Sequence, residues 1–350
     1  MARTTDTDLA PHELRILVAV ADAGGFSAGA EALGLTQSAV SHSVRGSERK
    51  IGAVLFERGR SGARPTPAGE KAVAHARRTL RLLAVLVAEA RQAARSEATQ
   101  GPEGPLRIAA FRSTALHLLP PVLQRLRARY PGIEPQVRIV RELGRGTAGE
   151  VADGRSDLAI ATLDGAQLPA GLVASGLFEE SYSLVHPAGH PAPRSLPLVD
   201  WVENCGSYTR AWWGAQDWIP RATIEAEDDG AVLSLVSGGH GMAIMPALSL
   251  VGATDSIEIT DLGPERPTRR VGYVTTPELA GSAVVRALVR ELRAAGSAIW
   301  RAAGSQVKAL LPNLNAVSEA FNHHSLPLDL VKPLAAAVPS MEPELRRHAI

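Results

Sequence analysis

Cysteine is almost absent from this chain, which has one cysteine, Cys205, among 350 residues. A single thiol excludes an intramolecular disulfide framework and a cysteine-rich zinc site, and it fits a reducing compartment. The sequence also lacks an apolar run of about 18 residues, the length that a membrane-spanning helix needs. Its first residues, Met1 to Leu9, are polar and lack the apolar segment of a secretory signal peptide. We therefore expect a cytoplasmic protein without a membrane partner.

Two motifs that carry catalysis or nucleotide binding are missing as well. There is no H-E-x-x-H zinc motif and no G-x-x-x-x-G-K-[ST] phosphate-binding loop. Cys205 has no histidine partner in a recognisable motif, and the pair His323-His324 is too small a set for a metal site. We expect neither catalysis nor a bound cofactor or metal.

The charge is nearly balanced over the whole chain but unevenly distributed. With 37 Lys and Arg against 36 Asp and Glu, the net charge is +1, which by itself does not predict nucleic-acid binding. Between Thr36 and Arg81, however, ten cations stand against three anions, a local net charge of +7. A positive patch near one end of a chain is typical of a nucleic-acid-binding segment. The length of 350 residues favours two domains.

Short helices and a basic loop are predicted for the first 65 residues. The expected elements are helices over His12–Ala23, Ala28–Leu33 and Gln37–Lys50, a strand-like run over Val54–Arg58 and a basic loop over Gly59–Pro65. Ser27 and Thr36 are expected to cap the second and third helices. Two short helices joined by a glycine-containing turn form the helix-turn-helix pattern, and the basic loop is expected to form its wing.

A long helix is predicted next, over Pro67–Ala94, with Thr66 as its cap and proline at its first position. Its apolar residues are spaced alternately three and four apart, which is the heptad seam of a coiled coil. They are Val73, Ala76, Leu80, Leu83, Val87, Ala90 and Ala94. We predict that this helix pairs with a second copy of the chain, and packing on its own domain is the alternative. Ser96–Pro105 is expected to be a hinge linker.

From Leu106 to Ala295 the sequence predicts an α/β fold. Strands and helices alternate in two successive sets, which is typical of parallel sheets covered by helices on both faces. Two such halves, with the chain crossing between them, predict a ligand cleft at their junction. Residues 301–350 combine five prolines with short apolar runs, and we expect a disordered or peripheral extension there.

Several stretches, by their order and spacing, resemble the LysR-type transcriptional regulators. They are Phe26–Leu33, Thr36–Ser41, Leu55–Arg58 and Thr66–Gly69, and more loosely Gly104–Ile108, Asp157–Ile160 and Val236–Pro246. The resemblance implies a winged helix-turn-helix over residues 9–66, a dimerising linker helix over 67–95, an effector domain similar to type 2 periplasmic binding proteins over 104–300, and an extension over 301–350. It also implies a homodimer or homotetramer that binds double-stranded operator DNA, with a small-molecule effector and RNA polymerase as further partners.

Two positions depart from this family pattern. Gly46-Ser47 stands where the family usually has a helix former and a large apolar residue, and glycine inside a helix costs about 1 kcal/mol relative to alanine. The recognition helix is therefore expected to be seated less firmly. His42 stands where the family often has arginine, which is expected to alter base preference.

The third helix and the basic loop carry the candidate DNA contacts. The candidates are Thr36, Gln37, Ser38, Ser41, His42 and Arg45 on the helix, and Arg58, Arg60 and Arg64 in the wing. Glutamine pairs well with adenine and arginine with guanine in the major groove. Ser41 and the N–H groups at the helix start suit phosphate. A solvated polar helix face and a solvated charged loop are the alternatives.

Candidate effector-binding residues follow strand ends in both halves. They are Arg112, Ser113, Thr114 and Thr162 in the first half, and Ser207, Tyr208, Thr209 and Arg210 in the second. Hydroxyls and guanidinium groups at the start of helices are suited to an anion, so two arginines facing one cleft would suit a carboxylate. Ordinary helix capping is the alternative for each. An effector-independent DNA-binding regulator, a solute-binding protein and an enzyme of the same α/β fold are the other functions considered.

Overall fold

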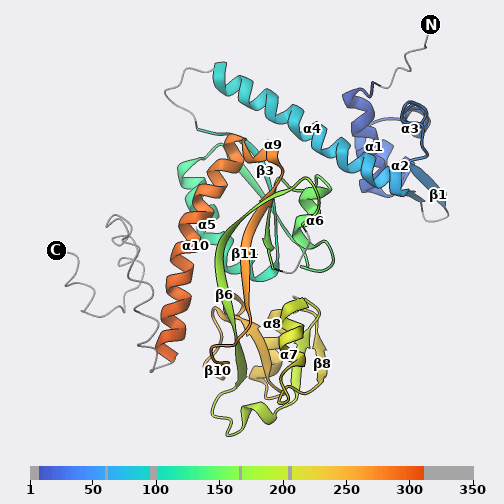
Figure 1. The fold of residues 1–350 in the computed structure, drawn as a ribbon. Helices are drawn as coiled ribbons and strands as arrows, with labels where there is room; N and C mark the ends of the chain where they lie inside the picture. The colour runs from blue at the N-terminus through green and yellow to red at the C-terminus, as the bar shows by residue number, and fades with distance from the viewer. Residues whose placement is uncertain (1–7, 60–61, 95–100, 165–167, 204–206, 311–350) are drawn as a thin grey trace. The chain divides into compact units, whose positions relative to one another are not determined.

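The structure is a computed structural model that describes residues 8–59, 62–94, 101–164, 168–203 and 207–310 (Figure 1). The N-terminal module contains helices α1 (Pro11–Ala23), α2 (Phe26–Leu33) and α3 (Gln37–Ile51), followed by strands β1 (Phe56–Gly59) and β2 (Gly62–Pro65). Strands β1 and β2 pair antiparallel, so the predicted loop is a hairpin. Helix α2 begins two residues earlier than predicted, with Gly25 and not Ser27 at its N-cap.

The core of this module is built from the apolar positions of its three helices and first strand. Leu17, Val20, Val40, Val44 and Leu55 are almost completely buried and belong to one hydrophobic cluster. Because Val40 and Val44 are one helical turn apart, α3 directs one side to the core and leaves the opposite side to solvent.

Glycine is required where the wing meets the turn between α1 and α2. Gly62 has φ +111°, and a Cβ placed on it would lie 2.2 Å from the Gly24 carbonyl oxygen. That same oxygen accepts a hydrogen bond of 2.8 Å from the Ala63 N–H. The wing is therefore tied to the helical part of the module by backbone contact, which no larger residue at position 62 would allow.

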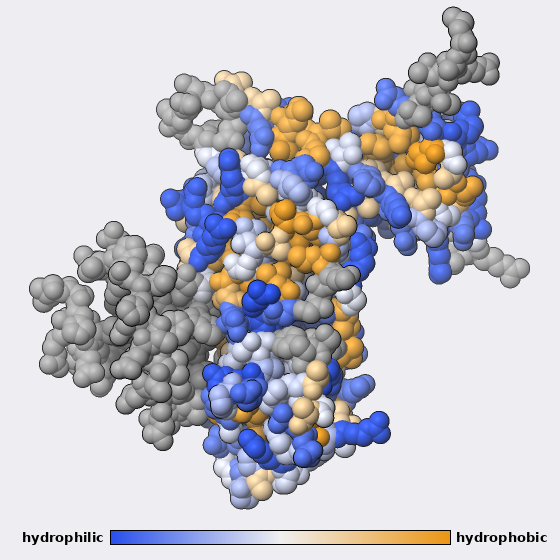
Figure 2. All heavy atoms as spheres, viewed as in Figure 1, coloured by the Kyte–Doolittle hydropathy of each residue, from blue (hydrophilic) through white to orange (hydrophobic). Residues whose placement is uncertain are grey.

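Helix α4 (Pro67–Ala94) has the bounds that the sequence predicts. At its start, Val73 and Ala76 are 2% exposed and pack in the module. Further along the seam, Leu83 and Val87 are exposed, at 38% and 42%. Figure 2 shows hydrophobic residues gathered along this helix. The heptad seam is thus divided into a buried first part and an exposed second part.

The first half of the α/β region is a sheet with strands of both directions. It contains β3 (Gly104–Ala110), η1 (Thr114–Leu118), α5 (Leu119–Arg129), β4 (Ile133–Ile139), α6 (Gly146–Ala152) and β5 (Leu158–Thr162). Strand β3 pairs in parallel with β4 and β5, as predicted. Strand β11 (Thr268–Thr275), however, pairs antiparallel with β5. The sheet is therefore mixed, because the chain returns from the second half through β11.

The second half is connected to the first by long strands. Strand β6 (Val173–Pro187) pairs with β11 over residues 173–181, then with β9 (Ala243–Pro246) and β10 (Ile257–Asp261) over residues 182–187. This half also contains β7 (Leu198–Trp201), α7 (Ser207–Gly214), β8 (Ala222–Ala226) and α8 (Asp229–Ser237), with β7 and β8 paired in parallel, and the short helices η2 (Pro193–Ser195) and η3 (Ala247–Leu250). Because β6 belongs to both halves, a movement of one half relative to the other must bend or twist this strand.

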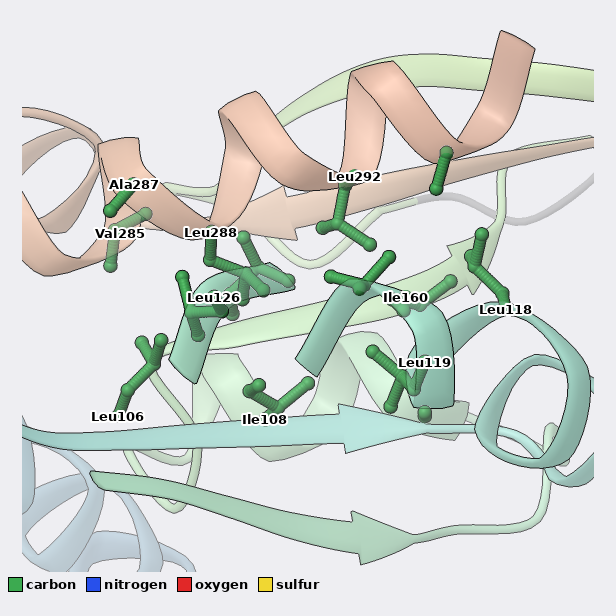
Figure 3. Close-up of a cluster of buried hydrophobic side chains, with 14 of the residues drawn as sticks. Leu106, Ile108, Leu118, Leu119, Leu126, Ile160, Val285, Ala287, Leu288 and Leu292 are labelled. Carbon is green, nitrogen blue, oxygen red and sulfur yellow. The ribbon is translucent and has the colours of Figure 1, made fainter. Parts of the chain in front are cut away.

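The largest hydrophobic core lies in the first half, between its sheet and helices α5 and α10 (Ala283–Leu310) (Figure 3). Leu126 on α5 and Leu288 on α10 are completely buried against Ile108 and Ile160 of the sheet. Helix α10 continues to Leu310, beyond Ala295, where the predicted α/β fold ends. Residues 311–350 of the predicted extension lie outside the described residues.

Candidate functional site

Helix α3 begins with the cap that the sequence predicts. The Thr36 hydroxyl accepts a hydrogen bond of 3.2 Å from the Ala39 N–H and lies 3.1 Å from the Ser38 hydroxyl. Behind this cap, Gln37, Ser38, His42 and Arg45 are exposed. Four of the predicted DNA contacts therefore share one solvent-facing side of the helix.

Ser41 differs from the other predicted contacts because its side chain is 5% exposed. Its hydroxyl accepts a hydrogen bond of 3.1 Å from the Gln37 side-chain amide. Its carbonyl accepts a further bond of 3.1 Å from Nε of Arg45. In this arrangement Ser41 orients Gln37 and Arg45, which present their polar ends to solvent.

The wing adds exposed cations beside α3. Arg58 on β1 and Arg64 on β2 are exposed, and the Arg58 guanidinium lies 4.2 Å from the centre of the Phe26 ring. Stacking on an aromatic ring holds a guanidinium in place while it keeps its charge. Arg60, the third predicted wing contact, lies outside the described residues.

The unusual Gly46-Ser47 pair is accommodated by α3 without a clash. Ser47 is completely buried, and its hydroxyl donates to the Ser43 carbonyl at 3.2 Å. A Cβ on Gly46 would meet its nearest atoms, on Arg49 and Glu13, at 4.0 Å, so a methyl group fits there.

Gly46→Ala is therefore expected to stabilise the N-terminal module by about 1 kcal/mol, because alanine restricts the unfolded chain and favours the helix. Hydrogen–deuterium exchange of α3 in the full chain measures this effect, and exchange should become slower. Unchanged or faster exchange in α3 would show that the helix already tolerates glycine without cost.

A narrow cavity lies between the two halves of the α/β region. Its volume is about 20 Å³, close to that of a single water molecule. The lining residues are Phe111, Arg112, Ser113, Glu142, Trp201, Glu203, Asp228, Asp229, Ser249 and Arg269. Two of these, Arg112 and Ser113, were predicted from the sequence.

The other predicted residues of the first half have internal partners. Thr114 is completely buried, and its hydroxyl donates to the Phe111 carbonyl at 2.8 Å. The Thr162 N–H donates to Oε1 of Glu142 at 2.9 Å. Both threonines lie near the cleft, but these contacts shape its walls.

Of the predicted residues of the second half, Thr209 and Arg210 are not among the described residues that line this cavity. Arg210 on α7 forms an ion pair of 2.6 Å with Asp200, and its guanidinium lies 4.6 Å from the Trp213 ring centre. Thr209 is completely buried. Ser207 and Tyr208 belong to the first turn of α7, and their side chains lie outside the described residues, as does Cys205.

The acidic residues of the cleft were missed from the sequence. Glu142 follows β4, Glu203 follows β7, and Asp228 and Asp229 begin α8, so three separate loops bring them together. One local signal was available, because Asp228 precedes a helix and caps it by accepting from the Ala231 N–H at 2.9 Å.

The electrostatics of the cleft reflect this acidic lining. Burial raises the pKa of Glu203 above its ordinary value, against a hydrogen bond from the Glu142 N–H and the charge of Arg141. The carboxylates of Asp229 and Glu142 raise it further. An additional positive charge in the cleft would therefore stabilise the ionised form of Glu203.

Metal sites and membrane-spanning helices are absent from the described residues. These residues contain no group of three or more histidine, cysteine or acidic side chains arranged to hold a metal ion. None of their helices is long and apolar enough to cross a membrane. Gly25–Gly29 matches the letters G-x-S-x-G, but Ser27 lies within α2 and not on the strand-to-helix turn that exposes a nucleophile.

Two family models match the chain. The model described as "Bacterial regulatory helix-turn-helix protein, lysR family" matches residues 11–70, and "LysR substrate binding domain" matches residues 99–297. Among curated relatives, "Probable HTH-type transcriptional regulator LrrA" of Synechococcus elongatus is 34% identical over 250 residues, covering 68% of this chain and 81% of the relative. A "Small neutral protease regulatory protein" of Streptomyces coelicolor is 32% identical over 291 residues, covering 76% and 86%.

Solved structures share the fold at lower identity. ArgP from Mycobacterium tuberculosis is 21% identical, with a TM-score of 0.63 over 83% of this chain and 98% of that one. CbnR in complex with its target DNA is 19% identical, with a TM-score of 0.56 over 82% and 100%. LysG from Corynebacterium glutamicum with bound effector Arg is 19% identical, with a TM-score of 0.59 over 83% and 98%.

Proposed function

The chain belongs to the LysR-type family of DNA-binding transcriptional regulators with an effector-binding domain, and on this premise we propose which of its residues perform each task. The exposed side of α3 reads operator DNA, and the wing contacts the phosphate backbone. The cleft between the two halves of the α/β region receives the small-molecule effector. The protein acts in the cytoplasm, where it contacts RNA polymerase at the promoter.

One observation carries the DNA-binding proposal: the division of α3 into two sides. Val40 and Val44 anchor the helix in the core, while Gln37, His42 and Arg45 face solvent near its N-terminal end. A recognition helix places the residues of its N-terminal turns against base edges in the major groove. In this arrangement Gln37 reads adenine, Arg45 reads guanine, and His42 reads a base where many relatives use arginine.

The wing and the start of α3 supply the contacts that position the protein. We assign Arg58, Arg60 and Arg64 to phosphate or minor-groove contacts, and Thr36 and Ser38 to phosphate at the start of α3. Each neutralised phosphate releases a condensed cation, so operator binding is expected to weaken steeply as salt increases.

Helix α4 is assigned to self-association. Its exposed apolar residues are Leu82, Leu83, Leu86 and Val87, between 37% and 62% exposed. An apolar stripe with heptad spacing is stabilised when a second identical helix covers it. We propose a homodimer through α4 and a homotetramer of two such dimers on the operator.

The effector controls the protein by changing the populations of two arrangements of this assembly. A ligand that binds one arrangement of the two halves better than the other changes the population of each. Through the oligomer, this changes the spacing of the paired recognition helices and therefore the bend of the bound DNA.

Arg45→Ala tests the assignment of α3. Loss of one base contact of this kind lowers affinity about tenfold to a hundredfold. The measurement is fluorescence anisotropy with a duplex that the wild-type protein selects from a random library. The matched control is Arg127→Ala, which removes an exposed arginine from α5. Equal affinities of Arg45→Ala and Arg127→Ala would remove Arg45 from the DNA interface.

A further inference from the structure

We propose that the effector is a small organic cation with ammonium or guanidinium groups, bound by the carboxylates of the cleft in place of the arginines that now occupy them. This inference rests on the proposed function, because it names the ligand class of the same cleft. It replaces the carboxylate ligand that the two predicted arginines suggest from the sequence alone.

The cleft has more negative than positive side chains. Among the described residues, four carboxylates, those of Glu142, Glu203, Asp228 and Asp229, line it together with the guanidinium groups of Arg112 and Arg269, a net charge of −2. Burial lowers the pKa of His117, which interacts with Asp229 and Arg112, below its usual value, so its protonation is disfavoured. The field in the cleft therefore attracts positive ligands.

Both arginines of the lining are already neutralised within the protein. Nε of Arg112 lies 2.8 Å from Asp229, and another of its nitrogens lies 3.5 Å from Asp228. Arg269 forms an ion pair of 2.7 Å with Glu180, which is 2% exposed. An anionic ligand would have to compete with these carboxylates for every guanidinium in the lining.

Three backbone donors near the cleft are occupied in the same way. The carboxylate of Glu142 accepts from the N–H groups of Thr147 and Thr162, each at 2.9 Å. Glu180 accepts from the Leu248 N–H at 2.6 Å. These are the kinds of groups that would bind a carboxylate or phosphate. The protein's own carboxylates already hold the places that an anion would take.

Arginines of the first half bridge to carboxylates of the second. Arg112 reaches Asp228 and Asp229, while Arg141 lies 3.6 Å from Glu203 and 4.0 Å from Glu227. With a cavity of only about 20 Å³, a ligand must displace side chains to enter. A cation that displaces these arginines replaces one positive partner by another. An anion would leave buried carboxylates without compensation, which is costly.

Aromatic side chains complete the pocket. Phe111 and Trp201 line the cavity and are 3% and 5% exposed. Ring faces attract ammonium and guanidinium groups, most strongly where water is excluded. The lining thus combines carboxylates and aromatic rings, the two types of group that recognise organic cations.

The test uses the full-length protein and three probes. Putrescine is the cation and adipate is the anion, and both have a four-methylene spacer. Agmatine serves as a guanidinium probe. Thermal unfolding and calorimetric titration in low-salt buffer should show stabilisation by putrescine or agmatine and none by adipate. Asp229→Asn should weaken cation binding about tenfold or more, because a charged partner is lost. Asp255→Asn, which changes an exposed carboxylate of the second half outside the lining, should leave it unchanged.

Arg112→Ala distinguishes the two ligand classes, because it should change the affinity for cations and for anions in opposite directions. Removing the internal competitor should strengthen binding of the cations, whereas an anionic effector would lose its partner and bind more weakly. The expected gain is about tenfold, the worth of one charged contact. Urea unfolding followed by tryptophan fluorescence, which reports on the α/β region because all five tryptophans lie after the N-terminal module, shows whether each variant is folded.

Three outcomes would overturn the proposal. Adipate binding that Arg112→Ala abolishes would replace the ligand class while keeping the cleft as the effector site. Cation binding that neither Asp229→Asn nor Arg112→Ala changes would remove the cleft itself from the proposed function. Absence of cation binding in both the wild type and Arg112→Ala would show that these carboxylates do not accept an external cation.

Discussion

Gly69→Ala is expected to disrupt the N-terminal module and abolish operator binding. A Cβ on Gly69 would lie 1.9 Å from the Leu55 carbonyl oxygen and 2.9 Å from its carbon, so backbone must move. The same oxygen accepts the 2.9 Å hydrogen bond from the Thr66 N–H that fixes the start of α4. Overpacking and the loss of this bond together should cost about 3 kcal/mol or more.

Hydrogen–deuterium exchange of the full-length protein measures this loss locally. Exchange should accelerate in α1, α3 and the first turns of α4, while the α/β region stays protected. Gly46→Ala is the matched control, because it adds the same methyl group at a glycine with free space. It should slow exchange where Gly69→Ala accelerates it. If Gly69→Ala had the same exchange rates and operator affinity as the wild type, α4 would not pack against Leu55 as described.

Glu180→Gln is expected to destabilise the α/β region by about 3 to 5 kcal/mol, the usual cost of removing one partner of a buried ion pair. Glu180 on β6 and Arg269 on β11 are cross-strand partners, joined by an ion pair of 2.7 Å. The Arg269 guanidinium also lies 4.9 Å from the Phe111 ring centre. Without the carboxylate, a buried positive charge stays behind.

Tryptophan fluorescence during urea unfolding isolates this effect, because all five tryptophans, at positions 201, 212, 213, 218 and 300, lie after the N-terminal module. The double variant Glu180→Gln/Arg269→Met removes both charges and should recover much of the lost stability. If the loss of stability in the double variant equals the sum of the losses in the two single variants, the ion pair contributes no interaction energy between these strands.

The elements with strong local signals were predictable from the sequence. Helix α4 has its predicted bounds because Thr66 and Pro67 mark its start. Helix α3 begins at the expected cap, Thr36. The exposed side of α3 was also predictable, because valines at helical spacing define which side is buried.

The cleft was only partly predictable because its chemistry depends on long-range contacts. Arg112 was found from its place after a strand, but nothing local shows that Asp229, more than a hundred residues later, neutralises it. The antiparallel return of β11 beside β5 has no local signal either, since strand direction is fixed by the connection of the two halves. The sequence therefore indicated Arg112 without the carboxylates that pair with it.

The most direct test of the central claim, that the exposed side of α3 reads operator sequence, is the ratio of affinities for the selected operator and for a scrambled duplex of equal length. We predict that Gln37→Ala/Arg45→Ala lowers this ratio toward one while its binding to scrambled DNA, which depends mainly on phosphate contacts, changes little. A ratio equal to that of the wild type at the same salt concentration would contradict the assignment of sequence recognition to α3.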